Sequence, residues 1–447
     1  MNTSRKGSKQ LVLFALMTTA FAEAYATNVG TDANLGYKPA AGAMGGAAYT
    51  MPQEASAAVF GNPATLADFK GKSFNLGAAY LGVSAKNTQS SAAGTNVSKS
   101  GANDYVAPDV GLAIELAPGS VLGLGLEIDA GLGADYRDKP ISLVGVSGAA
   151  TLPLVVELVS FNVNAAFARK LTPEWSVGGA ATLGFGLAQL GTAGPTSGLP
   201  PALGDFGGTT SSVHAFGAGF SLGTTYSPME DLRFSAAYKS KLGYKFKDIV
   251  HTSVAGAGYQ DIKIQQPEEV ILGVASGRSE GPWLFEADLV WKAWSRAKTY
   301  QDVWKDQWLL AVGGQHAVGP WRLRAGYHYS SDIMRKNPNN TLGGLVGLGT
   351  VPLGSAAQSA GLGLVAQDVV GIVQTTLLPV VMKHTLSAGV GYQFDKSMRL
   401  DVFGAYAFRD SVERTDGNTA AVLSAPVTTF KGEARVWSVG AGLNFSF

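Results

Sequence analysis

The sequence predicts an all-β protein, a transmembrane antiparallel β-barrel of about 14 strands. Three observations lead to this prediction: an N-terminal export signal, segments in which apolar and polar residues alternate, and links of alternating length. Of the 447 residues, 46 % are hydrophobic and only 15 % are charged, against about 25 % in an average soluble domain. No segment after the N-terminus has the 18 apolar residues in a row that indicate a transmembrane helix. Without helical spans, a chain in hydrocarbon can pair its backbone groups only in a closed barrel.

The first 26 residues predict a cleaved secretory signal peptide. Arg5, Lys6 and Lys9 form a basic region, residues 11–22 are mainly apolar, and residues 24–26 (Ala-Tyr-Ala) form a cleavage site of the small-x-small type. A membrane anchor is the alternative, but the apolar stretch is shorter than the about 20 residues that a span needs. We therefore expect an exported protein in the outer membrane of a Gram-negative cell.

The strands are predicted from a period of two in the side chains. In 122–132, for example, Leu, Ile and Ala at even positions alternate with Gly, Glu and Asp at odd positions. A barrel requires this pattern because one face of each strand meets lipid and the other meets the lumen. The predicted strands are 74–84, 109–117, 120–136, 158–169, 175–189, 213–226, 232–248, 268–278, 283–294, 307–318, 321–331, 384–394, 398–410 and 430–447.

The links between these strands alternate in length. Short links carry turn residues, as in Pro118-Gly119 and Gly319-Pro320. The long links span 86–107, 137–157, 190–212, 249–267, 295–306, 332–383 and 411–429. Outer-membrane barrels have this asymmetry, with short periplasmic turns and long external loops.

Seven of the eight tryptophans are predicted to lie at the two membrane interfaces, where amphipathic rings are favoured. Trp175, Trp283 and Trp321 directly follow short turns. Trp291, Trp294, Trp304 and Trp308 are placed at the opposite interface, near a long loop. Trp437 lies in the middle of a strand and is less informative.

Residues 27–72 lack the alternation of the barrel, which is assigned to residues 73–447. The segment is rich in small residues and poor in charge, as in Gly42-Ala43-Met44-Gly45-Gly46-Ala47-Ala48. A disordered tail would carry more charge. We therefore expect a compact hatch that plugs the lumen, with a disordered periplasmic tail as the alternative.

The stretch 45–67, and in particular Asn62-Pro63-Ala64, resembles the N-terminal hatch of the FadL-type transporters for hydrophobic compounds. The stretches 266–274, 288–295, 305–314 and 323–327 agree, and the resemblance extends over the whole mature chain. The chain departs from it at Asp332, where the family usually has a proline.

The resemblance implies a monomeric barrel that carries long-chain fatty acids or aromatic hydrocarbons across the outer membrane without an energy source. External loops capture the ligand, the lumen holds it, and it leaves sideways through a gap at an inward kink in the third strand. Long-chain fatty acids are the first expectation and aromatic hydrocarbons the second. The barrel would contact outer-membrane lipid and lipopolysaccharide.

Candidate residues follow from this scheme. The third strand, 120–136, has four glycines that could host the kink because glycine weakens a strand: Gly123, Gly125, Gly131 and Gly133. The long loop 332–383 is rich in Leu and Val, and its candidates for ligand capture are Leu377, Leu378, Val380 and Val381. The alternative is that this loop packs on itself as a helical cap.

Five cations are predicted by the alternation to face the lumen, where they could bind a carboxylate: Arg233, Lys239, Lys292, Arg322 and Arg324. Four inward carboxylates offer an alternative role for them, in pairs that fasten the hatch: Glu127, Asp129, Glu286 and Asp288.

Other functions have little support. A net charge of +1 does not suggest a nucleic-acid partner. The absence of cysteine excludes thiolate metal sites, and the five histidines lack metal-ligand spacing, so neither a metal nor a cofactor is expected. No serine elbow or acidic dyad indicates an enzyme. The remaining alternatives are a general porin and a structural or adhesive barrel.

Overall fold

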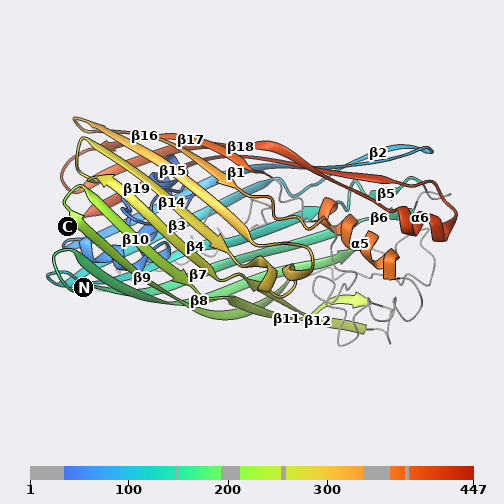
Figure 1. Ribbon diagram of the computed structural model, residues 1–447, viewed down its shortest axis with the longest axis horizontal. Coiled ribbons are helices and arrows are strands. Elements are labelled where there is room, and N and C mark those ends of the chain that lie inside the picture. Colours follow the sequence, from blue (N-terminus) through green and yellow to red (C-terminus); the bar gives the residue numbers. More distant parts are fainter. Residues whose placement is uncertain (1–34, 146–149, 193–211, 253–257, 337–362, 378–381) are drawn as a thin grey trace, which may run out of the picture.

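A computed structural model describes residues 35–145, 150–192, 212–252, 258–336, 363–377 and 382–447. The predicted signal peptide, residues 1–26, lies outside this part of the chain. The wall consists of long antiparallel strands (Figure 1). Its strands are Lys72–Ser91 (β1), Asp104–Ala117 (β3), Ser120–Asp135 (β4), Leu154–Lys170 (β7), Trp175–Thr192 (β8), Val213–Met229 (β9), Leu232–Lys239 (β10), Glu269–Gly277 (β13), Trp283–Lys292 (β14), Gln307–Val318 (β15), Trp321–Ser330 (β16), His384–Gln393 (β17), Met398–Thr415 (β18) and Thr429–Ser446 (β19).

These strands close into a barrel. In the described part of the chain, 14 strands pair with their neighbours in sequence order, and β19 returns to pair with β1 from Ser73–Ser446 to Ser90–Thr429. A fifteenth strand, β2 (Gly94–Lys99), extends this sheet as a hairpin on β1. The predicted barrel of about 14 strands is confirmed. No described helix is long and apolar enough to cross a membrane.

The outer face of the wall is apolar, as the alternation predicts. Exposed side chains from strands all round the barrel are Leu76, Val106, Leu124, Leu183, Phe216, Leu272, Phe285, Leu310, Leu323, Leu386 and Val439. The exposed Trp175, Trp283 and Trp321 open β8, β14 and β16 at the short-turn end. Trp294 and Trp304 were predicted at the opposite interface, and this prediction is wrong. Both are buried, and each packs edge-on against the other with ring centroids 4.8 Å apart.

One strand prediction is also wrong. The segment 232–248 divides into β10 and β11 (Leu242–Thr252), and β11 pairs with β12 (Gly258–Gln266). Much of the predicted loop 249–267 is therefore a hairpin. Leu242 and Tyr244 of this hairpin pack on Gly184 and Gly217, whose positions alternate with outward-facing apolar residues of β8 and β9. The hairpin therefore starts inside the barrel.

Smaller elements lie in the long links, and those labelled in Figure 1 are on its right side. They are Ile141–Leu143 (β5), Ala150–Leu152 (β6), Trp294–Arg296 (η3), Tyr300–Asp302 (η4), Gly363–Thr376 (α5) and Gly417–Leu423 (α6). Helix α5 belongs to the predicted loop 332–383 and packs its buried Val370 and Val373 into the main apolar cluster. Gln374 donates from Nε2 to the carbonyl of Val303 at 2.7 Å. This end of the loop is therefore packed on the protein itself.

The N-terminal segment, residues 35–69, forms helices Pro39–Ala43 (α2) and Ala55–Phe60 (α3) and the 3-10 helix Pro63–Asp68 (η1). Most of its residues are buried. Its elements contact β1, β3 and β4 on one side of the barrel, β7 to β9 on another, and β16 to β19 on a third. A segment that touches strands all round the wall lies inside the barrel, and it does so towards the short-turn end (Figure 1).

Candidate functional site

The Asn62-Pro63-Ala64 motif lies where the N-terminal segment meets β8 and β9. Asn62 is extended and fully buried, and its Oδ1 accepts a hydrogen bond from the Ala64 N–H at 3.1 Å, which caps η1. Pro63 occupies the first turn of this helix, where its missing N–H costs nothing. A Cβ added at Gly178 of β8 would lie 2.6 Å from the Ala64 nitrogen, and one at Gly223 of β9 would overlap the Asn62 amide. The motif is therefore seated directly on two wall glycines.

A buried lysine fastens the start of the same segment. Lys38 Nζ lies 2.8 Å from Asp109 of β3 and 2.8 Å from Glu127 of β4, and 4.7 Å from the centroid of the Phe60 ring. Asp109 also accepts from Ser56 Oγ at 2.8 Å. One cation of the N-terminal segment thus joins two neighbouring strands of the wall.

The opposite wall holds the segment by its backbone. Glu286 of β14 accepts from the Thr50 N–H at 2.6 Å, and Asp288 accepts from the Tyr49 N–H at 3.3 Å. Gln53 is held by arginines, with its carbonyl accepting from Arg399 at 2.6 Å. Carboxylates and arginines of the wall therefore position the segment from several sides.

The five cations predicted to face the lumen are all paired with carboxylates. Arg233 pairs with Asp68, Lys239 and Lys292 with Glu269, Arg322 with Glu280, and Arg324 with Asp401. Two of them hold the N-terminal segment, because Asp68 belongs to it and Arg324 also donates to the Gln53 side chain at 2.7 Å. Of the predicted carboxylates, Glu127, Glu286 and Asp288 contact this segment, although not through the five predicted cations.

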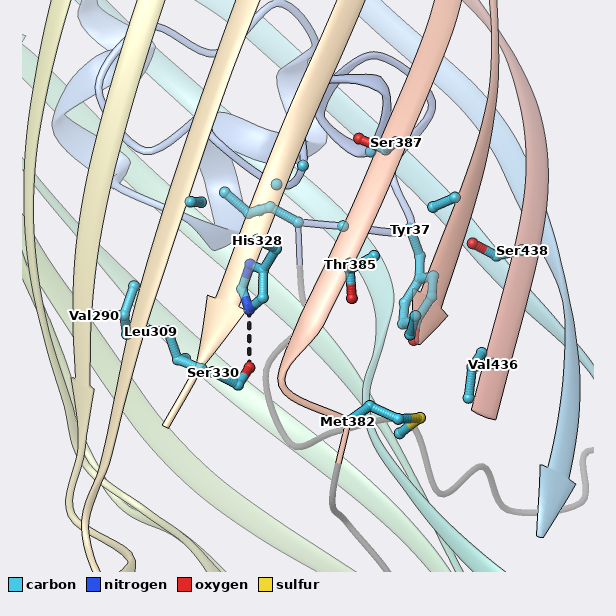
Figure 2. Close-up of a pocket in the computed structure, with 18 of the residues that line it drawn as sticks. Tyr37, Val290, Leu309, His328, Ser330, Met382, Thr385, Ser387, Val436 and Ser438 are labelled. Carbon is cyan, nitrogen blue, oxygen red and sulfur yellow. Dashed lines mark hydrogen bonds between the residues drawn. The ribbon is translucent and has the colours of Figure 1, made fainter. Parts of the chain in front are cut away.

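An apolar chamber lies between the N-terminal segment and strands β14 to β19 (Figure 2), with about 810 Å³ of empty space that includes its open side. Its apolar lining includes Val290, Leu309 and Val436. Figure 2 shows Tyr37 of the N-terminal segment reaching toward these strands, and His328 hydrogen-bonded to Ser330 at 3.2 Å. The polar groups of this chamber are hydroxyls and one imidazole, so it suits an apolar compound.

A gap interrupts the barrel wall between β3 and β4. The two strands pair up to Asp109–Glu127. Beyond this pair, among the described residues, 104–108 pair with β1 alone, and 128–135, apart from Asp129, pair with β7 alone. Pro108, which has no N–H to donate, is the first residue of β3 without a partner on β4. At its far end the gap is closed by a hydrogen bond of 2.8 Å from the Gly101 N–H to the Asp135 carbonyl. We call this region, 104–108 and 128–134, the wall gap.

The third strand of the barrel is β4, and its irregularity lies at Asp129. The register between β4 and β7 shifts between Ile128 and Ala130. The four candidate glycines are Gly123, Gly125, Gly131 and Gly133, and all are in regular register with β7.

The candidate capture residues are only partly described. Leu377 directly follows α5 and is buried in the main apolar cluster. Leu378, Val380 and Val381 lie outside the described residues. Met382, which follows them, lines the apolar chamber.

Sequence reasoning missed several residues that position the segment, among them Lys38, Asp109, Arg399 and Asp401. Asp109, Arg399 and Asp401 occupy inward positions of strands whose alternation is clear, so the period of two could have placed them. Lys38 lies in a segment without periodicity, and no local signal identifies its partners.

Comparisons with known proteins agree with this geometry. The model of the family described as outer membrane protein transport protein (OMPP1/FadL/TodX) matches residues 14–342. No curated protein was found to match in sequence. The crystal structure of the toluene transporter TodX of Pseudomonas putida is 18 % identical, with a TM-score of 0.64 and 93 % of this chain and 99 % of that chain covered.

Two further solved structures are similar. The toluene transporter TbuX of Ralstonia pickettii is 19 % identical, with a TM-score of 0.59 over 91 % of this chain and 98 % of that chain. A FadL homologue of Pseudomonas aeruginosa is 13 % identical, with a TM-score of 0.62 over 95 % of this chain and 100 % of that chain. At these identities the likeness shows the fold.

Proposed function

The chain belongs to the OMPP1/FadL/TodX family of outer-membrane proteins that transport hydrophobic compounds, and we propose that it works by loop capture, lumen binding and lateral release. Because β19 closes on β1 within one chain, a single copy forms the whole wall and needs no second copy to close it, and we propose a monomer. The observation that carries the proposal is that one barrel contains both the apolar chamber and the wall gap, with the N-terminal segment in its lumen.

Capture and binding would take place at the long-loop end. An apolar solute crosses the hydrated lipopolysaccharide surface poorly, and an apolar surface lowers this barrier. Leu378, Val380 and Val381 would offer that surface next to the buried Leu377, and Met382, which follows them in the sequence, lines the chamber. The N-terminal segment would act as the hatch that prevents ions and small polar solutes from passing through the lumen.

Release would take place through the wall gap. A regular barrel wall has no opening between strands because every backbone group is paired with a neighbour. Here the facing edges of 104–108 and 128–134 are not paired with each other. A solute that passes this gap enters the membrane directly and needs no aqueous channel.

The ion pairs in the lumen help to decide which class of compound is transported. Each of the five predicted lumen cations already has a carboxylate partner, so an ionised fatty acid would have to displace one of them. Two of the pairs, Lys292 with Glu269 and Arg324 with Asp401, are buried, and breaking a pair of this kind costs about 3–5 kcal/mol. The geometry therefore favours uncharged aromatic hydrocarbons, with long-chain fatty acids as the second candidate.

Uptake by a strain that lacks the gene and carries it on a plasmid tests the proposal. We expect faster uptake of labelled toluene than with the empty plasmid, a smaller effect on oleate, and no faster leakage of arabinose. Leu309→Asn, in the chamber, should lower toluene uptake several-fold, whereas Leu310→Asn, on the lipid face, should not. Faster arabinose leakage without toluene uptake would indicate a porin. Altered surface attachment without any change in uptake would indicate an adhesive or structural barrel.

A further inference from the structure

A second chamber lies on the other side of the lumen, and its lining is polar. It has about 460 Å³ of empty space, including its open side, between Phe60 of the N-terminal segment and the strands β4 and β7 to β10. Its polar lining consists of Glu127, Asp129, Asn162, Asn164, Thr182, Ser221, Lys239, Ser240, Gln266 and Glu269. It adjoins the apolar chamber, because Lys239 Nζ lies 5.8 Å from the ring centroid of Tyr49, which lines the latter. We call it the polar chamber.

Buried polar atoms without a hydrogen-bond partner are concentrated here. Among the described residues, the uncharged atoms of this kind in the chamber lining are Asn162 Oδ1, Asn164 Oδ1 and Ser221 Oγ. Asn162, Asn164 and Ser221 are 6 %, 4 % and 3 % exposed. Asn164 does use its Nδ2, at 3.5 Å from the Val59 carbonyl, so the oxygen is the group left over. Buried polar groups without partners are rare because each costs free energy, and several around one space indicate something that binds there.

The atoms specify the chemistry of the missing partner. The two asparagine oxygens accept hydrogen bonds, and the Ser221 hydroxyl donates or accepts them. A group that both donates and accepts satisfies more of them than one that only accepts.

The charges around the polar chamber restrict the chemistry of its ligand further. Asp129 has a hydrogen bond from Ser160 at 3.4 Å and no ion pair among the described residues. With Asp109, Glu127 and Glu269 it makes four carboxylates against three ammonium groups, those of Lys38, Lys239 and Lys292. An anionic group would therefore be repelled, whereas an uncharged one would not.

The position of the chamber relates it to transport. Glu127 is the last β4 residue paired with β3, and Asp129 lies at the register shift beside the wall gap. Phe60 and Leu242 supply apolar surface next to the polar groups. A compound with an apolar body and one hydroxyl would meet both kinds of surface.

We infer that the polar chamber binds the hydroxyl group of an uncharged apolar compound, such as a phenol or an alcohol, before it reaches the wall gap. The inference rests on the proposed function and narrows its substrate class. It predicts selectivity for hydroxylated compounds over the parent hydrocarbons, whereas the apolar chamber accepts both.

Binding of three para-substituted rings to the purified full-length protein tests this: toluene, p-cresol and p-toluate. We expect p-cresol to bind about tenfold more tightly than toluene, as one or two well-placed hydrogen bonds allow. Asn162→Leu with Asn164→Leu, and separately Ser221→Ala, should remove most of this preference and leave toluene unchanged. Ser176→Ala, at a buried serine of β8 outside both chamber linings, is the matched control and should leave the preference intact. Heat-dependent gel migration checks that each barrel is assembled.

Several results would overturn the inference. Equal binding of p-cresol and toluene by the unmodified protein would show a chamber filled with water only. The same conclusion follows if the asparagine variants change thermal stability but not the preference. Binding of p-toluate that depends on the asparagines would mean that the chamber takes acids. If the protein does not increase toluene uptake by cells, the proposed function is contradicted. The preference of the purified protein for p-cresol is measured separately, so the two failures can be distinguished.

Discussion

Two glycines of the wall determine how closely the Asn62-Pro63-Ala64 motif approaches it. Gly178 and Gly223 are neighbours across β8 and β9, and the motif occupies the space that their side chains would need. Glycine is required here for close approach of two backbones rather than for an unusual dihedral angle. The cap on η1 and this close contact together hold the corner at which the N-terminal segment turns toward β1.

Gly178→Ala tests the role of this contact. The new Cβ would lie 2.6 Å from the backbone of Pro63 and Ala64, and overpacking of this kind costs about 1–3 kcal/mol. We expect the segment to shift and the current through single proteins in planar bilayers to rise. The control is Gly179→Ala, whose Cβ faces outward and meets a flexible leucine at 3.3 Å. Equal currents from both variants would mean that the motif does not hold a hatch.

At the scale of elements, the wall gap and the N-terminal segment meet at one ion cluster. Lys38 bridges Asp109 and Glu127, the last directly opposed residues before β3 and β4 separate. Without the lysine, two buried carboxylates would face each other across the strands, and like charges in this position destabilise a sheet. The segment thus fixes one end of the gap.

Lys38→Met should therefore destabilise the protein more than an ordinary lysine substitution. Removing one partner of a buried ion cluster costs about 3–5 kcal/mol. In urea unfolding we expect a clear loss of stability, with faster hydrogen exchange in 104–109. Lys70→Met removes an exposed pair with Glu115 and should cost about 1 kcal/mol or less. The prediction fails if the two variants are equally stable. It also fails if adding Glu127→Gln to Lys38→Met restores none of the lost stability.

Most of the strands could be predicted because their signal is local. One side chain in two meets lipid, and this period is visible in a strand whatever lies around it. The break between β10 and β11 could not be predicted in this way, since Leu242, Tyr244 and Phe246 continue the alternation of β10. Only the glycines of β8 and β9, on which β11 rests, distinguish the inward hairpin from a longer wall strand.

The candidate site was predicted less completely because its contacts join distant parts of the chain. The motif at 62–64 was found by resemblance, but its seat on Gly178 and Gly223 was not. The five lumen cations were placed on the correct face by periodicity, yet periodicity says nothing about their partners. Trp294 and Trp304 were misplaced because a buried aromatic cluster and an aromatic belt at the membrane interface contain the same residue types, so the sequence does not distinguish them.

On the scale of the whole molecule, the barrel combines a filled lumen with an interrupted wall. The N-terminal segment occupies the short-turn half, and the two chambers lie beside it against opposite walls. The proposed lateral route depends on the wall gap alone, so a cross-link over the gap tests it without disturbing either chamber lining. The chain has no cysteine, so two introduced cysteines can form a disulfide only with each other.

The most direct test is toluene uptake with Ala107→Cys and Ala130→Cys on the two sides of the wall gap. As a control, Ala287→Cys and Val312→Cys are directly opposite each other in the regular pairing of β14 and β15. With the gap pair oxidised to a disulfide, we expect toluene uptake to fall to that of cells without the protein, and to recover on reduction. The control pair should transport equally well in both states. Unimpaired uptake with the gap pair fully cross-linked would contradict lateral release.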